Sequence, residues 1–213
     1  MLGEGKQIGH FTIIKKLGEG GMGAVYLAED TKLHRQVALK VIAAEFLDDP
    51  ERGRRFQREA RTAAQINHPN VMAIYDIGTA TDEETGRNIS FIVMEYVPGR
   101  SLGDYLVEKQ PEMKELIRIA EKIASGLAAA HKLNIVHRDI KPDNILIDEN
   151  KEPKILDFGL AKPLEAFAFE EQSDSTETVS QELTKVGKIM GTVSYMSPEQ
   201  VQGQPVDTRS DIF

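Results

Sequence analysis

The hydrophobic pattern of this 213-residue chain changes at Pro98-Gly99, and this change constrains the fold more than any other feature. Before it, short β-branched or alternating apolar runs are separated by polar or glycine-bearing turns, which is typical of an antiparallel meander. After it, apolar residues recur at helical spacing. The expected strands cover residues 11–17, 24–29, 36–42, 73–78 and 89–95. The sequence therefore predicts an α+β fold, with an antiparallel five-stranded sheet followed by a mainly helical part.

Helices are predicted on both sides of this change. The first lies within 50–66, between the third and fourth strands, where Phe56 and Ala60 share an apolar face. Its remaining faces carry Arg52, Arg54, Arg55, Arg58 and Arg61. In the second part, Ser101 and Asp104 have the spacing of a helix N-terminus. A long amphipathic helix is indicated further on by Leu116, Ile119, Ala120, Ile123, Leu127 and Ala130.

Composition excludes several classes of protein. The 34 acidic and 26 basic residues give a net charge of -8, which argues against nucleic-acid partners and against attraction to an anionic membrane surface. The absence of cysteine excludes a disulfide framework and thiolate zinc sites, and makes a cytoplasmic location the default expectation. No apolar run approaches the length of a membrane-spanning helix. We therefore expect one domain of two lobes, without a membrane segment.

The most specific chemical signal is the run HRDIKPDN at 137–144, which Asp157 of a D-F-G triplet follows thirteen residues later. The carboxylate of Asp139 can accept a proton from an attacking hydroxyl, and Lys141 can neutralise a migrating phosphoryl group. Asn144 and Asp157 offer the oxygen donors that Mg²⁺ prefers. A His-Arg-Asp triplet alone is more often a core histidine beside a surface ion pair. The whole spacing instead favours phosphoryl transfer.

A glycine-rich turn, GEGGMG at 18–23, lies between the first two expected strands. Its glycines would let backbone N–H groups close over phosphates. By itself the motif is weak, because a dinucleotide-binding turn or a flexible hairpin without ligand has similar glycines. Residues 24–28 have the pattern of a strand, which disfavours the dinucleotide fold.

Lys40 ends an otherwise apolar strand segment and needs a buried or ligand-borne anion nearby. Glu59, on the predicted 50–66 helix, could supply this anion. Taken singly, the two residues fit a lysine that extends to solvent and a glutamate on an exposed face. Together with the glycine-rich turn, they favour a phosphate-binding site.

These motifs resemble those of the protein kinase family, and the match to bacterial serine/threonine kinase catalytic domains runs from about residue 11 to the end of the chain. The resemblance implies a protein-kinase-like two-lobe fold. Residues 1–10 would be an N-terminal extension, 11–97 the sheet lobe and 98–213 a helical lobe truncated at the start of its central helix. The last of these contains a long acidic activation segment at 157–199.

The resemblance also implies ATP and Mg²⁺ as cofactors and a role for each motif residue. Asp139 would be the catalytic base, Lys141 the cation that stabilises the transferred phosphate, and Asn144 and Asp157 the metal ligands. Lys40 would contact the α- and β-phosphates while Glu59 holds Lys40, in a contact that depends on where the helix lies. Nucleotide-binding residues would be Leu17, Gly18, Gly20, Gly21, Gly23, Val25, Ala38, Lys40, Glu95, Val97 and Leu146, with Met94 as gatekeeper and the 95–97 backbone on the adenine edge.

The implied activity is transfer of the γ-phosphoryl group of ATP to Ser or Thr hydroxyls of protein substrates. Lys141 within K-P-D-N resembles the serine/threonine form, where tyrosine kinases place alanine and arginine. Arg138 before Asp139 suggests regulation by phosphorylation of the activation segment. Thr184 is the first candidate for this modification, with Thr176, Thr178 and Ser180 as alternatives.

Three expectations concern departures from the family pattern. Residues 165–182 contain six acidic residues and no basic one, so we expect a solvated loop, or a regulatory or docking segment, disordered unless modified or bound. Asp211 is expected to support the catalytic loop from below. Glu199 is expected to be an unpaired acid, because its usual arginine partner would lie beyond residue 213.

Two alternative functions remain. One is a nucleotide-binding pseudoenzyme or interaction module, and the other is a small-molecule kinase, which the run 195–199 disfavours.

Overall fold

The computed structural model describes residues 2–20, 23–43, 50–82, 86, 88–158 and 194–213. The predicted acidic segment 165–182 and the candidate phosphorylation sites Thr176, Thr178, Ser180 and Thr184 lie outside the described residues, as does Gly21. The expectations about them therefore stay predictions.

The N-terminal lobe is built on a six-stranded antiparallel sheet with the order β1-β2-β3-β4-β6-β5. Its strands are β1 (Gln7–Ile8), β2 (Phe11–Gly20), β3 (Gly23–Asp30), β4 (Arg35–Ile42), β5 (Ile74–Thr81) and β6 (Asn88–Glu95). The five predicted strands are confirmed. Strand β1 was not predicted, because two residues carry no detectable alternation. Ile8 is only 2% exposed, so part of the expected N-terminal extension lies in the core of the sheet.

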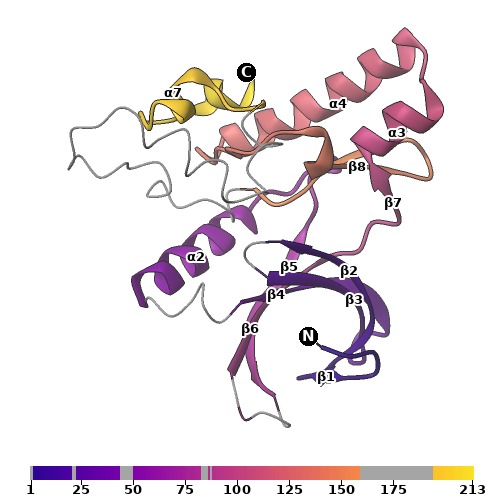
Figure 1. The fold of residues 1–213 in the computed structure, drawn as a ribbon, viewed down its shortest axis with the longest axis vertical. Coiled ribbons are helices and arrows are strands. Elements are labelled where there is room, and N and C mark those ends of the chain that lie inside the picture. The colour runs from indigo at the N-terminus through magenta and orange to yellow at the C-terminus, as the bar shows by residue number, and fades with distance from the viewer. Residues whose placement is uncertain (1, 21–22, 44–49, 83–85, 87, 159–193) are drawn as a thin grey trace, which may run out of the picture.

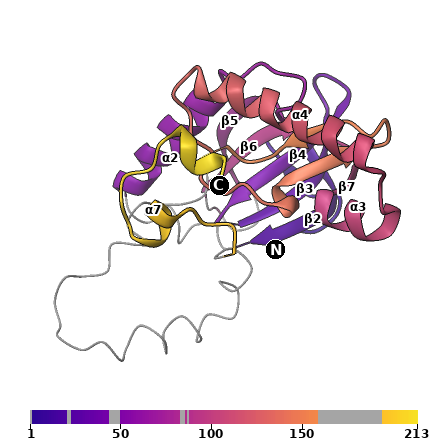
Figure 2. The ribbon, with the colours of Figure 1, turned by 90° about the horizontal axis from the view of Figure 1, so that it is seen from above.

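Alternating side chains of the strands fill two hydrophobic clusters, one on each face of the sheet. Leu39 of β4 belongs to the first cluster, with Phe11 and Phe91. The neighbouring Ala38 faces the second, where Phe56 and Ala60 of α2 (Pro50–Ala63) pack against the sheet. This confirms the apolar face predicted for the 50–66 helix. Figures 1 and 2 show α2 lying beside the sheet.

The second lobe contains the two predicted helices, α3 (Leu102–Lys109) and α4 (Met113–His131). Ser101 caps α3, since its hydroxyl accepts the Asp104 N–H at 3.0 Å. Short helical turns follow at η1 (Pro142–Asn144), α7 (Pro198–Val201) and η3 (Thr208–Asp211). A three-stranded sheet of β7 (Gly99–Ser101), β8 (Ile145–Asp148) and β9 (Pro153–Ile155) was not predicted, because strands of three or four residues are too short for a clear period.

The two lobes meet where β9 contacts the segment between α2 and β5. Ile155 donates its N–H to the carbonyl of Asn70 at 2.9 Å and accepts the N–H of Met72 at 2.9 Å. Its side chain is fully buried in the cluster that joins Ala63 of α2 to Leu127 of α4. One residue therefore fixes both the backbone and the side-chain packing at this boundary.

Ile155→Ala should lower the free energy of unfolding by about 2–5 kcal/mol, because it opens a cavity in a site that three elements enclose. Ile117→Ala is the matched control, since Ile117 lies on α4 with 54% of its side chain exposed. Urea unfolding followed by circular dichroism measures both. Equal losses in the two variants would contradict the central packing role of Ile155.

Candidate active site

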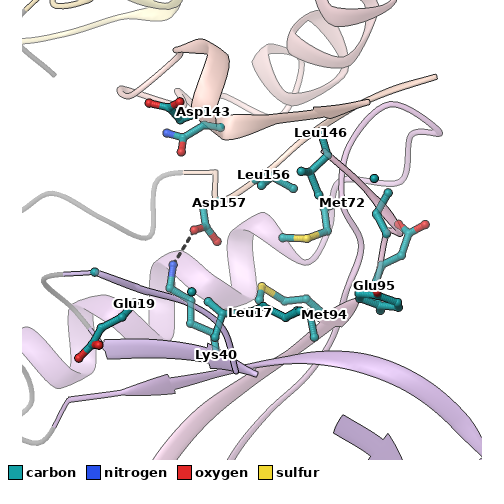
Figure 3. A pocket seen from close by; sticks show the side chains of 18 of the residues that line it. Leu17, Glu19, Lys40, Met72, Met94, Glu95, Asp143, Leu146, Leu156 and Asp157 are labelled. Atoms are coloured by element: carbon teal, nitrogen blue, oxygen red, sulfur yellow. Dashed lines mark hydrogen bonds and ion pairs between the residues drawn. The ribbon is translucent and has the colours of Figure 1, made fainter. Parts of the chain in front are cut away.

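A cavity of about 680 Å³ lies between the lobes. The predicted site residues that line it are Leu17, Gly18, Gly20, Gly23, Val25, Ala38, Lys40, Met94, Glu95, Val97, Asp139, Lys141, Asn144, Leu146 and Asp157. Figure 3 shows Leu17, Glu19 and Lys40 on one side of the cavity and Asp143, Leu146 and Asp157 on the other. Residues from the glycine-rich turn and from the HRDIKPDN run, more than 100 positions apart, thus share one pocket.

The anion that Lys40 requires is Asp157. The Lys40 Nζ lies 2.7 Å from Asp157 Oδ2, and Lys40 is only 7% exposed. The two side chains point toward each other across the pocket (Figure 3). Asp157 has a left-handed backbone with φ of 51°, and its Oδ1 atom is buried without a hydrogen-bond partner. One carboxylate oxygen therefore holds Lys40 while the other is left to bind something else.

The structure does not bring Glu59 to Lys40: no hydrogen bond or ion pair joins them among the described residues. Glu59 is half-buried on α2, and it does not line the pocket. Burial raises the pKa of its carboxyl, while the positive charges of Arg138 and Arg55 oppose that rise. Burial and these two arginines are thus the causes of its shifted pKa.

The proposed base Asp139 is held by its neighbours in the 137–144 loop. Asn144 donates from Nδ2 to the Asp139 carbonyl at 2.7 Å and to Asp139 Oδ2 at 2.9 Å. The Nζ of Lys141 lies 3.2 Å from the same Oδ2. The η1 turn makes this possible, because it folds Asn144 back toward the residues that precede it. The spacing noted in the sequence therefore closes a compact polar cluster.

The expected support of this loop by Asp211 is confirmed. Its buried carboxylate accepts the backbone N–H groups of His137 and Arg138, each at 2.8 Å, and lies 2.8 Å from His131 Nε2. Arg138 has a left-handed backbone with φ of 67°. Figures 1 and 2 show the C-terminal segment (yellow) near α4, which carries His131. Asp211 thereby fixes a strained part of the loop next to Asp139.

Glu199 forms no ion pair with a basic residue in the described part of the chain, as expected, but it does have a hydrogen-bond partner. Its Oε1 accepts a hydrogen bond from the Ser210 hydroxyl, because the η3 turn places Ser210 against α7. The adjacent Gln200 donates from Nε2 to the Arg138 carbonyl at 2.7 Å. Residues 199 and 200 thus attach the C-terminal segment to the 137–144 loop.

The model of the protein kinase domain matches residues 11–213. The chain belongs to the protein kinase family. Serine/threonine-protein kinase PrkC of Bacillus subtilis (strain 168) is 42% identical over 211 residues, and serine/threonine-protein kinase PknB of Mycobacterium leprae (strain TN) is 40% identical over 198 residues. The crystal structure of a double mutant of the Mycobacterium tuberculosis PknI kinase domain aligns with a TM-score of 0.72 at 27% identity.

Each match covers most of this chain but a smaller share of the other protein. The match to PrkC covers 98% of this chain and 30% of PrkC, and the match to PknB covers 92% of this chain and 29% of PknB. The match to the PknI structure covers 99% of this chain and 74% of that chain. The chain thus spans less than a third of the length of these curated relatives. The predicted kinase-like fold of an antiparallel sheet lobe and a helical lobe is confirmed. In the part of the chain that the structure describes, no helix has the length and apolar character needed to cross a membrane.

Membership of the protein kinase family implies the use of Mg²⁺, and the oxygen atoms of Asp157 and Asn144 are of the kind that this ion binds. The buried, unpartnered Oδ1 of Asp157 is a hard anionic oxygen, and the amide oxygen of Asn144 is left available because its Nδ2 donates to Asp139. Among the described residues, no group of three or more His, Cys, Asp or Glu could hold a metal by itself. The remaining ligands of Mg²⁺ would therefore be water and phosphate oxygens, as this ion usually has.

Several pocket residues of this kinase were not found from the sequence. They are Glu19, Met72, Gly99, Asp143 and Leu156. Met72 reaches the pocket because its backbone pairs with Ile155, a long-range contact that leaves no local pattern. Leu156 could have been suspected from its position directly before Asp157.

His137 is the buried titratable group of the catalytic loop. Its Nε2 lies 2.6 Å from the Leu156 carbonyl, and the Asp139 N–H donates to its Nδ1 at 3.2 Å. Only a neutral ring protonated at Nε2 makes both bonds. Burial lowers the pKa of His137 below its ordinary value of 6.5, against the opposing effects of the Leu156 hydrogen bond and the charge of Asp211.

The stability of this kinase should fall as the pH drops below 6.5. In that window the unfolded chain binds a proton at residue 137 that the folded chain excludes, so unfolding is favoured by up to about 1.4 kcal/mol per pH unit. Urea unfolding at pH 7.5, 6.5 and 5.5 measures the slope. His137→Asn keeps a donor and an acceptor without titrating, and should flatten it. An unchanged slope in the variant would assign the effect to another group.

Proposed function

We propose that this chain is the catalytic part of an ATP- and Mg²⁺-dependent serine/threonine protein kinase. The observation that carries the proposal is that Lys40, Asp157 and the Asp139 cluster line one pocket of nucleotide size. The printed names of the curated relatives, serine/threonine-protein kinases, support the same activity.

The nucleotide would lie between the lobes, with its base and its phosphates at different ends of the pocket. Val25, Ala38 and Leu146 supply apolar surfaces for the adenine, and the 95–97 backbone supplies polar groups for its edge. The glycines of the β2–β3 turn and the ammonium of Lys40 would contact the phosphates. A bound Mg²⁺ would neutralise phosphate charge from the side of Asn144 and Asp157.

The transfer step would rely on the cluster around Asp139. A substrate hydroxyl would give its proton to Asp139 while its oxygen attacks the γ-phosphorus, and ADP would leave on the opposite side. Lys141, 3.2 Å from Asp139 Oδ2, would reach the migrating phosphoryl group. Asn144 holds Asp139 from two sides, which orients the base before substrate arrives.

Regulation through the activation segment is part of this proposal. The Nε of Arg138 is buried and has no hydrogen-bond partner, which suits an arginine that waits for a phosphate group. The separation of Glu59 from Lys40 supports the same view, since the described arrangement lacks the contact that the family uses for catalysis. It equally favours the second candidate, a chain that binds nucleotide without transferring phosphate.

The test is incubation of the protein with labelled ATP, Mg²⁺ and a basic protein substrate. Asp139→Asn should reduce phosphate transfer by about 10²–10⁴-fold while nucleotide binding persists, because the variant loses the proton acceptor alone. Asp76→Asn, on the exposed face of β5, is the matched control and should retain activity. Nucleotide binding without any transfer by the unsubstituted protein would reject the kinase and favour the second candidate.

Mass spectrometry of the same reactions tests the regulatory part. Autophosphorylation should appear on Thr184 or on one of its neighbours Thr176, Thr178 and Ser180. An active enzyme with this segment unmodified would exclude the proposed regulation without excluding the kinase.

A further inference from the structure

An ion pair between Glu95 and Lys154 crosses the boundary between the lobes beside the pocket. Both carboxylate oxygens of Glu95 lie 2.6 Å from the Lys154 Nζ. The two side chains are 25% and 18% exposed, so water screens this pair less than it screens the exposed pairs of the helical lobe. Short, charge-assisted and partly buried contacts of this kind are strong and define a geometry.

Glu95 is held at the point where the chain leaves the sheet lobe. It is the last residue of β6, and it lines the pocket together with Tyr96 and Val97. Its N–H donates to the Ala73 carbonyl at 2.9 Å, and the Ala73 N–H donates to its Oε2 at 3.3 Å. Its carboxylate therefore has one weak backbone donor besides Lys154.

Lys154 is held on the other side, in the middle of β9. It pairs with Leu146 of β8, which lines the pocket, and the next residue, Ile155, is fully buried and bonded to the backbone of Asn70 and Met72. Lys154 does not itself line the pocket. Its side chain reaches the pocket through Glu95, to which it donates two hydrogen bonds.

We propose that Lys154 is a positioning residue, which holds the Glu95 carboxylate and thereby sets the distance between the 95–97 backbone and the Leu146 floor of the adenine site. The inference rests on the proposed function, because it concerns how the same pocket selects its nucleotide. Without Lys154 the partly buried carboxylate of Glu95 would turn toward water to recover its lost donor. Hydrogen bonds from the 95–97 backbone depend on distance and angle, so that movement would weaken recognition of the base.

Base selectivity is the property that separates this role from a merely structural one. Inosine triphosphate has the ribose and phosphates of ATP but an oxo group in place of the 6-amino group of adenine. A backbone edge that pairs with the amino group leaves polar groups unpaired when the oxo group replaces it. General loosening of the lobes would weaken the binding of both nucleotides equally.

The experiment measures dissociation constants for ATP and inosine triphosphate by titration calorimetry, with the whole chain. In Lys154→Met, binding of ATP should weaken about tenfold and that of inosine triphosphate much less, so the ratio of the two constants approaches one. Lys122→Met is the matched control, because it breaks a lysine–glutamate pair of the same lobe, with Glu152, outside the pocket. It should leave both constants unchanged.

A charge exchange, Glu95→Lys with Lys154→Glu, protects the test against a folding defect and should restore part of the ATP preference. A variant Lys154→Met that keeps the wild-type ratio, or that loses both nucleotides equally, would overturn the inference, as would a wild type without preference for ATP. If the wild type binds neither nucleotide, the proposed function itself has failed. The two failures are thus distinguishable.

Discussion

The arrangement of the lobes depends on a buried ammonium that cannot remain alone. Lys40 lies on an apolar strand of the sheet lobe, where an unpaired charge is costly, and its partner Asp157 comes from the helical lobe, 117 positions later. Loss of one member of a buried pair typically costs about 3–5 kcal/mol, because the other charge is left uncompensated. This requirement brings the glycine-rich turn and the catalytic loop to opposite sides of a single cavity.

A second carboxylate, that of Asp211, stabilises the left-handed backbone conformation in the 137–144 loop. A left-handed residue such as Arg138, with φ of 67°, costs about 1–3 kcal/mol. Two backbone N–H bonds to the charged Asp211 offset this cost, since hydrogen bonds to charged groups contribute about 1.5–3 kcal/mol each. The strain therefore persists next to Asp139, and it orients the loop without any contact to substrate.

The features predicted correctly are those that depend on the spacing of residues close together in the sequence. The five longer strands, the face of α2 that carries Phe56, and the lining of the pocket follow from periodicity and from motifs whose chemistry requires particular residue types. Strands β1, β7, β8 and β9 were missed because they are short, and Met72 because a distant backbone pairing places it. The hydrogen bond to Glu199 was missed for the same reason, since Ser210 reaches it through a turn that no pattern indicated.

The partner of Lys40 could not be predicted, because two carboxylates compete for it. Glu59 and Asp157 both satisfy the requirement for an anion, and the choice depends on the position of α2, which packing rather than propensity decides. In the structure, Lys40 donates a hydrogen bond to Asp157, while burial raises the pKa of Glu59 and the positive charge of Arg138 opposes that rise. An ammonium has three donors, so Lys40 can donate to Glu59 as well without releasing Asp157. The position of α2 therefore decides whether Glu59 joins the pair that Lys40 forms with Asp157.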